Sequence, residues 1–450
     1  MVTSPRNHDC PAVRRPAEPW PVSRPAVKWH DHPGWAAYAP VVSKPAPPSG
    51  PLSGLLVADF SRVLAGPYCT MLLADLGAEV IKVESPAGDD TRQWAPPVTS
   101  AGVSTYYLSI NRNKRSVALD LTDPEDLAAA RELTRRADIM VENFKPGGLA
   151  RFGLDYDSVR ATNAAIVYAS ISGFGSGGGK NLPGYDLMVQ AMSGLMSLTG
   201  DPAGPPYRAG VAVFDVMAGL HTTIGILAAL NHRAATGVGQ HVQANLLASA
   251  LSGMVNQSSA YVAGGVVPFR MGNSHPSLFP YEPLPTAEGD LIVIAGNDAQ
   301  FRKLCEVLGA PRLADDPRFS RNEDRTANRD TLRRLLVERL AGRPAAEWFS
   351  DLIAAGVPCG PINTIDQGIA FAEEIGLDPV VRAGGQAGLP TIRHPVSYSQ
   401  TPPRYDLPPP ALDEHGSQIR AWLGDSPDTE DRALGLADPA ASALQSGAAS

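Results

Sequence analysis

The stretch Leu55-Leu-Val-Ala-Asp-Phe-Ser-Arg-Val-Leu-Ala-Gly-Pro-Tyr-Cys-Thr-Met-Leu-Leu-Ala-Asp-Leu-Gly-Ala-Glu-Val-Ile-Lys-Val-Glu84 decides the predicted fold. Its two ends, residues 55–60 and 80–84, are short apolar runs of the kind that form buried strands. Between them, Pro67 suits the first turn of a helix and Gly77 suits its C-terminal end. The stretch therefore predicts a strand, a helix and a second strand.

The same alternation continues along the chain, and a helix running to about Arg136 begins with the capping-box spacing of Thr122 and Glu125. Buried-type strands that alternate with helices predict an α/β fold with a parallel sheet, helices on both faces and right-handed crossovers. The further predicted strands cover residues 116–120, 139–143 and 166–170.

Ligands of such sheets bind at the carboxyl ends of the strands. The candidate site is therefore built from the residues that directly follow three predicted strands. These residues are Val63, Leu64 and Ala65, then Asn143, Phe144 and Lys145, and then 172–174.

Downstream, helical segments and a proline-rich connection lead to a second α/β unit. Helices are predicted at 186–197, 216–233 and 246–261, followed by the connection 268–285, the strand 291–294 and helices near 298–308, 329–341 and 345–355. Residues 1–50 are a proline-rich tail, and residues after about 425 are predicted to be disordered. Trp20, Trp29 and Trp35 leave open whether the N-terminal tail is disordered or packs along the folded body or a partner subunit.

Composition excludes several classes of protein. A net charge of −8 and a pI near 5.6 argue against a nucleic-acid binder. The four cysteines (Cys10, Cys69, Cys305 and Cys359) are too scattered for a zinc site or a disulfide framework. We find neither a secretory signal nor an unbroken apolar run of about 18 residues. The prediction is a cytoplasmic protein without a membrane partner.

One carboxylate stands out in the segment Arg208-Ala-Gly-Val-Ala-Val-Phe-Asp-Val-Met-Ala-Gly-Leu-His221. Asp215 lies among apolar residues at the start of a long apolar, helix-compatible run. Aspartate is a good N-cap, which is one interpretation. The other is a nucleophile at a helix N-terminus, where the dipole favours the ionised form.

Other motifs are weaker. Residues 173–180 are glycine-rich but lack the Walker spacing, so they predict a flexible loop or a lid. The cations of Asn111-Arg-Asn-Lys-Arg-Ser116 form either a solvated turn or a site for an anion, and Lys145 and Arg151 carry a similar signal. His221 and His275 are isolated, which argues against a metal site. Tyr185 and Asp186 begin a helix as a packing aromatic and a cap, although Asp186 is a second candidate catalytic carboxylate.

An ordered set of segments from Leu52 to Leu423 resembles the class III coenzyme A transferases, the CaiB/BaiF family. No single segment is specific, but their order is. The resemblance is carried by residues 59–67, 77–84, 111–116, 141–147, 183–186, the Asp215 stretch, 236–240 and 272–276.

The resemblance implies an interlocked homodimer. Each chain would have a large Rossmann-like domain, a linker, a smaller α/β domain and a C-terminal segment that returns to complete the large domain. The corresponding boundaries are 1–50 for the N-terminal tail, 51–245 for the large domain, 246–285 for the linker, 286–375 for the small domain, 376–424 for the return segment and 425–450 for the C-terminal tail.

The resemblance also implies a chemistry without a metal. Asp215 would attack an acyl-CoA thioester and form an anhydride and then an aspartyl-CoA thioester, which passes CoA to an acceptor acid. Backbone N–H groups near Val63–Ala65 would stabilise the oxyanions. The residues expected to contact CoA are Arg151, Asn143, Phe144, Lys145, Lys114 and Arg115. The chain departs from the formyl-CoA transferase branch, because Ser85, Thr122 and Pro183 replace its basic CoA contacts and Leu64 replaces its glutamine.

Two alternatives remain at this stage. The same family contains α-methylacyl-CoA racemases, which use a His-Asp pair where this chain has Gly184-Tyr185-Asp186. Tyrosine, with an ordinary pKa near 10, is a poor base at pH 7, so transfer is favoured over racemisation. The third possibility is a non-catalytic CoA-binding subunit. No motif identifies the acyl donor or the acceptor.

Overall fold

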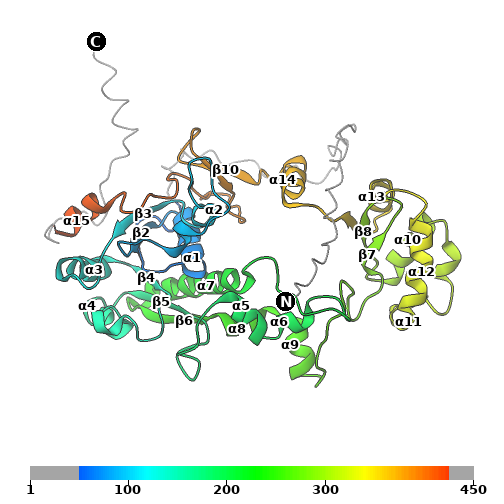
Figure 1. The fold of residues 1–450 in the computed structure, drawn as a ribbon, viewed down its shortest axis with the longest axis horizontal. Coiled ribbons are helices and arrows are strands. Elements are labelled where there is room, and N and C mark those ends of the chain that lie inside the picture. The colour runs from blue at the N-terminus through cyan, green and yellow to red at the C-terminus, as the bar shows by residue number, and fades with distance from the viewer. Residues whose placement is uncertain (1–49, 425–450) are drawn as a thin grey trace, which may run out of the picture. The chain divides into compact units, whose positions relative to one another are not determined.

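The computed structural model describes residues 50–424, so the predictions for the N-terminal tail up to residue 49 and for 425–450 lie outside the described residues. Its main sheet has six parallel strands in the order β3-β2-β1-β4-β5-β6 (Figure 1). The predicted parallel sheet is confirmed, and the strand order reverses between β1 and β4, which is where such sheets form a ligand crevice. The strands are β1 (Leu56–Asp59), β2 (Glu79–Glu84), β3 (Lys114–Ala118), β4 (Ile139–Glu142), β5 (Val167–Ser172) and β6 (Gln240–Asn245).

Helices cover both faces of this sheet because side chains alternate along each buried strand. In β1, for example, Val57 belongs to the core shared with α1 (Ala65–Asp75) and α7 (Val213–Thr236). The next residue, Ala58, belongs to a second core on the opposite face. That second core is covered by α3 (Pro124–Arg136), α4 (Tyr156–Thr162) and α15 (Gly416–Gly424).

The sequence prediction is wrong in two local details. The side chain of Asp123, and not that of Thr122, accepts hydrogen bonds from the first-turn amides of Glu125 and Asp126 and caps α3. The edge strand β6 was not predicted, because its polar residues lack the continuous apolar character of a buried strand. Shorter elements of this region are η1 (Asp90–Gln93), α2 (Thr105–Ser109), η2 (Ala150–Phe152), α5 (Asp186–Met192), α6 (Leu195–Leu198), α8 (Leu246–Gly253) and α9 (Val255–Val262).

A second, antiparallel sheet has the order β7-β8-β9 and its own apolar core. It contains the predicted strand near Leu291, while the end of the predicted connection 268–285 forms a strand as well. Its elements are β7 (Tyr281–Pro285), β8 (Asp290–Ile294), α10 (Asp298–Val307), η3 (Pro311–Ala314), α11 (Asn322–Ala327), α12 (Arg329–Leu340), α13 (Ala345–Ala354) and β9 (Cys359–Pro361). The chain continues through α14 (Ile365–Glu374) and the hairpin β10 (Val380–Ala383) and β11 (Leu389–Ile392).

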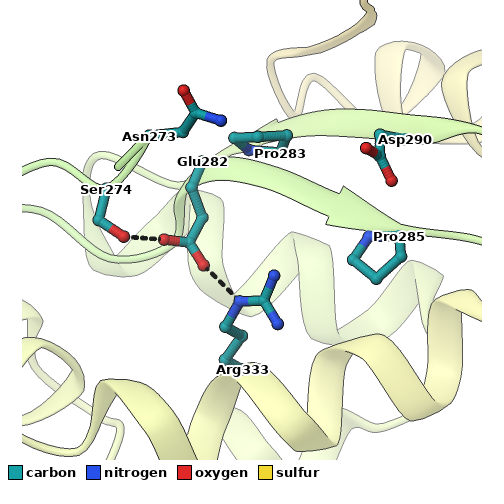
Figure 2. A pocket seen from close by; sticks show the side chains of 7 residues that line it. All are labelled: Asn273, Ser274, Glu282, Pro283, Pro285, Asp290 and Arg333. Atoms are coloured by element: carbon teal, nitrogen blue, oxygen red, sulfur yellow. Dashed lines mark hydrogen bonds and ion pairs between the residues drawn. The ribbon is translucent and has the colours of Figure 1, made fainter. Parts of the chain in front are cut away.

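The segment 272–276, one of those that carry the family resemblance, is attached to this second unit through Glu282. The buried carboxylate of Glu282 accepts a hydrogen bond from Ser274 and pairs with Arg333 at 2.9 Å (Figure 2). These residues line a cavity of about 360 Å³. Glu282 already bonds to Ser274 and Arg333, so this cluster anchors the segment.

Helix α7 has the length and apolar composition of a membrane-crossing helix, unlike any other helix among residues 50–424. The core helix of a globular protein meets the same criterion. Three of its residues, Phe214, Ala218 and Ile226, are buried in the core on the α1 side of the sheet.

Candidate active site

Asp215 is the third residue of α7, and the predicted N-cap role belongs to other residues. The N-cap position is Ala212, which has no capping side chain. The carboxylate that holds the helix start is that of Asp186, the first residue of α5. Its Oδ1 accepts the N–H of Phe214 at 2.8 Å and that of Asp215 at 3.3 Å. Asp186 therefore fixes the backbone from which the Asp215 side chain projects.

A buried glutamine extends this arrangement. Gln190 lies one turn after Asp186 on α5, and its Nε2 donates to Asp186 Oδ2 and to the carbonyl of Val211. Its Oε1 accepts from the N–H of Ala209 at 2.8 Å. The segment that leads into α7 is thus tied to α5. The sequence analysis missed Gln190, although its spacing of four residues from Asp186 was a usable signal.

The environment of Asp215 changes its acidity. Burial, and then the like charge of Asp186, raise the pKa of Asp215 to about 7. These effects outweigh the helix N-terminus, which alone would favour the ionised form. A carboxylate with this pKa is more basic than an ordinary aspartate, and it ionises close to neutral pH.

The first turn of α1 lies on the same side of α7 as Asp215. Gly219 follows Asp215 by one helical turn, and a Cβ added at Gly219 would stand 2.7 Å from the carbonyl oxygen of Ala65. The backbones are therefore close there, which brings Ala65, the first residue of α1 and one of the predicted site residues, to α7 one turn from Asp215. The amides of the first turn of α1 have no acceptor within the helix.

Tyr106 in α2 is a site residue that sequence reasoning missed. Burial, followed by the charges of Asp215, Asp186 and Asp89, raises the pKa of Tyr106 to about 12. The phenol therefore remains protonated beside these carboxylates. Its ring packs edge-on against Trp94 at 5.0 Å. No local pattern in the sequence marks Tyr106, because α2 reaches this site only through tertiary structure.

Two of the cations that the sequence predicts for CoA are accessible. Arg151 and Lys145 are exposed, and the guanidinium of Arg151 lies 4.4 Å from the ring of Phe152. Phe144 is half-buried. Asn143 has another role, because its amide accepts the N–H of Arg62 at 3.0 Å and donates to the carbonyl of Arg62 at 2.7 Å.

The predictions for Lys114 and Arg115 need correction. Lys114 is fully buried and bonds to Asp59 at 3.1 Å, so its ammonium is not accessible to CoA. Burial lowers the pKa of Lys114 to about 8, although Asp59 opposes this. Arg115 pairs with Glu79 at the first residue of β2, away from the carboxyl edge. Arg112 is buried as well, so two of the three cations in this segment are not solvated.

A cavity of about 370 Å³ lies where β4, β5 and β6 meet the loop that contains Phe144 and Lys145. At its floor, the Ser170 hydroxyl is within 2.8 Å of His241 Nε2. Burial raises the pKa of Glu142, against a hydrogen bond with Ser170. The polar side chains of Glu142, Ser170 and His241 in this cavity are therefore hydrogen-bonded to one another.

The remaining candidates lie apart from these contacts. The Tyr185 ring is 65% exposed. His221 bonds through Nδ1 to Ser249 at 3.0 Å, and His275 packs against Tyr281. Within residues 50–424, no three His, Cys, Asp or Glu side chains are grouped as a metal site would require.

The strand order defines a Rossmann-like α/β fold with a switch point between β1 and β4. Residues 52–416 match CoA-transferase family III, and the chain belongs to that family. It is a CoA-transferase, as its relatives are, and acyl-CoA is its substrate.

Two relatives and one solved structure show how similar the chain is to other members of the family. The chain is 44% identical over 389 residues to a succinate–glutarate CoA-transferase of Agrobacterium fabrum, covering 83% of this chain and 96% of the relative. It is 40% identical over 380 residues to an acetyl-CoA:oxalate CoA-transferase of Acetobacter aceti, covering 84% and 96%. A CaiB/BaiF family protein from Brucella suis superimposes with a TM-score of 0.76 at 42% identity, covering 83% of this chain and all of that one.

Proposed function

We propose that the enzyme moves CoA between two dicarboxylic acids and that Asp215 is its nucleophile. The observation that carries the nucleophile proposal is the position of Asp215: half-buried, with a pKa raised to about 7, on a backbone fixed by Asp186. The names of the relatives support the substrate class, since succinate, glutarate and oxalate are all dicarboxylates.

The reaction begins when the ionised Asp215 attacks the thioester carbonyl of the donor. The C–S bond breaks, the CoA thiolate leaves, and an aspartyl–acyl anhydride remains. The thiolate then attacks the aspartyl carbonyl and expels the donor acid, which leaves an aspartyl-CoA thioester. The acceptor carboxylate repeats these two steps in reverse order and leaves as its CoA ester. Each half of the reaction exchanges one CoA thioester for another through an anhydride, so the overall transfer is nearly balanced.

Other residues of the site stabilise the intermediates and bind CoA and the acid. The first-turn amides of α1 stabilise the oxyanion of each tetrahedral intermediate. The protonated phenol of Tyr106 donates a hydrogen bond to the carboxylate of the acid that is bound beside Asp215. Arg151 and Lys145 pair with the phosphates of CoA. Arg208 is exposed in the segment that Gln190 ties to α5, and we assign it to the second carboxylate of the acid.

We also propose that the enzyme is an interlocked, cytoplasmic homodimer with the domain boundaries predicted above. Apolar side chains at Leu220, Ile224 and Leu227 are exposed along one face of α7, and Ile365 of α14 is 86% exposed. A second copy of the chain would cover them. Light scattering tests this: the native protein should have twice the chain mass, and Ile224→Asp should shift it towards monomer.

The substrate proposal is tested by mixing the enzyme and succinyl-CoA with glutarate, oxalate or acetate and following the new CoA ester. Glutaryl-CoA or oxalyl-CoA should form faster than acetyl-CoA. Arg208→Ala should remove most of that preference by raising KM for the dicarboxylate, with KM for acetate unchanged. A preference for acetate in the native enzyme would contradict the substrate class while leaving the Asp215 chemistry untouched.

A further inference from the structure

Side chains of Asp59, Lys82, Asp89 and Asn143 hold five polar backbone groups of the loop between β1 and α1, residues 61–64. The amide of Arg62 is held by Asn143, as described above. The amide of Ser61 donates to Asp59 at 3.0 Å. The amide of Val63 donates to Asp89, whose two carboxylate oxygens lie 3.3 and 3.2 Å away. The conformation of this loop is therefore imposed by its surroundings.

Val63 has an unfavourable backbone conformation. Its φ is +68°, in the left-handed region that β-branched residues rarely adopt. Such residues persist only where neighbouring groups fix them, and they concentrate at functional sites. The contact that fixes Val63 is the one to Asp89. The next residues, Leu64 and Ala65, lead into the turn of α1 that touches α7 at Gly219.

Asp89 is itself fixed by buried partners. It is 3% exposed, and its Oδ2 pairs at 2.9 Å with Lys82, which is fully buried. Lys82 also donates to the carbonyl of Ser61 at 3.0 Å, so one ammonium holds both the loop and its anchor. Thr91 donates through its N–H and its hydroxyl to Asp89 Oδ1. Burial alone would raise the pKa of Asp89, but Lys82 and Thr91 hold it below the ordinary value.

We propose that Asp89, paired with Lys82, is a positioning residue for CoA transfer. By holding Val63 in the left-handed conformation, Asp89 directs the first-turn amides of α1 at the carbonyl that Asp215 attacks. This inference rests on the proposed role of Asp215. The ion pair of Asp89 and Lys82 is buried and touches no substrate, but it controls the rate of the chemical step.

Asp89→Asn is the direct test, because the groups that bond to the Asp89 carboxylate, on Val63, Lys82 and Thr91, are all hydrogen-bond donors. Either orientation of the asparagine amide turns an N–H group towards Thr91 or towards Val63 and Lys82. We expect kcat to fall about ten- to hundred-fold with less than about a three-fold change in KM for acyl-CoA. Asp75→Asn is the matched control: Asp75 is a buried carboxylate paired with Arg112 at 2.6 Å, and no contact joins it to residues 61–64. It should lower the melting temperature with kcat unchanged.

A double-mutant cycle separates positioning from general destabilisation. Glycine adopts positive φ without strain, so Val63→Gly should restore kcat of Asp89→Asn at least about five-fold beyond its own effect on the native enzyme. Purely multiplicative effects would overturn the proposal, as would equal losses of kcat in Asp89→Asn and Asp75→Asn. If Asp89→Asn does not fold, Thr91→Val removes one donor to Asp89, and its smaller loss of kcat should show the same rescue.

Failure of the positioning role of Asp89 can be distinguished from failure of Asp215 as the nucleophile. Full activity of Asp215→Asn would reject Asp215 as the nucleophile, whatever the cycle shows. If Asp215 is the nucleophile, the native enzyme and Asp89→Asn should reach the same amount of hydroxylamine-trapped adduct, but Asp89→Asn should reach it more slowly. Equal rates of adduct formation would overturn the role of Asp89 alone.

Discussion

The carboxylate of Asp186 accepts the backbone N–H of Asp215 at 3.3 Å, so one acidic residue orients another while its charge raises the pKa of its neighbour. The two effects can be separated by substitution. Asparagine keeps an acceptor oxygen for the start of α7 but removes the charge, whereas alanine removes both.

The first prediction concerns this capping role. Asp186→Ala should lower the free energy of unfolding by about 1–2 kcal/mol, the usual cost of losing a helix cap, and should lower kcat about ten-fold or more. Asp186→Asn should retain most of the stability. Chemical denaturation and steady-state kinetics on both variants provide the measurement, and equal loss of stability in the two would contradict the capping role.

The second prediction concerns pH. Because the pKa of Asp215 is raised to about 7, the residue is protonated below that pH and cannot attack, so kcat/KM for acyl-CoA should rise with pH through about 7. Asp186→Asn removes the like charge, which makes ionisation easier and moves the inflection to lower pH. Burial remains, so the inflection should stay above the ordinary aspartate value. The exposed Asp120→Asn serves as control and should leave the profile in place, and an unmoved inflection in Asp186→Asn would exclude Asp186 as a cause.

The third prediction separates structural cations from ligand-binding ones. Lys114→Met leaves Asp59 buried without its lysine partner and should cost about 3–5 kcal/mol of stability. Its folded fraction should keep the native KM for acyl-CoA. Arg151→Ala should do the opposite, raising that KM about ten-fold with little change in stability. Thermal melts measure the stability of the two variants, and initial rates measure their KM. A raised KM for acyl-CoA in Lys114→Met would show that Lys114 contacts CoA after all.

The fourth prediction concerns the contact of α1 with α7. Gly219→Ala places a methyl group 2.7 Å from the Ala65 carbonyl, which must shift the first turn of α1. We expect a loss of about 1–3 kcal/mol and a fall in kcat larger than the change in KM. Gly368→Ala in α14, where an added Cβ meets nothing within 4 Å, is the helical control and should be neutral or stabilising. Unchanged kcat in Gly219→Ala would show that α1 does not serve the reaction.

The fold was largely predictable because its signals are local. Apolar runs such as 55–60 and 80–84, with the glycine and proline between them, identify strand, helix and strand without tertiary information. Edge strand β6 was missed because its residues are polar and only its hydrogen bonds to β5 define it.

The site was only partly predictable. Asp215 could be singled out as a lone carboxylate in an apolar segment, but its capping partner Asp186 lies 29 residues earlier and meets it only in the folded chain. Lys114 shows the opposite error. A run of cations indicates a solvated or ligand-binding segment, whereas here Asp59, on the strand β1 two positions away in the sheet, compensates the buried charge of Lys114 on β3. Such pairings depend on register and packing, which no local pattern contains.

The most direct test of the central claim is the mass of the intact protein during turnover. The enzyme is incubated with succinyl-CoA, treated with hydroxylamine, and weighed before and after proteolytic mapping. We predict one hydroxamate per active site, located at Asp215, and none in Asp215→Asn. A hydroxamate at another residue, or CoA transfer at the native rate by Asp215→Asn, would contradict the account.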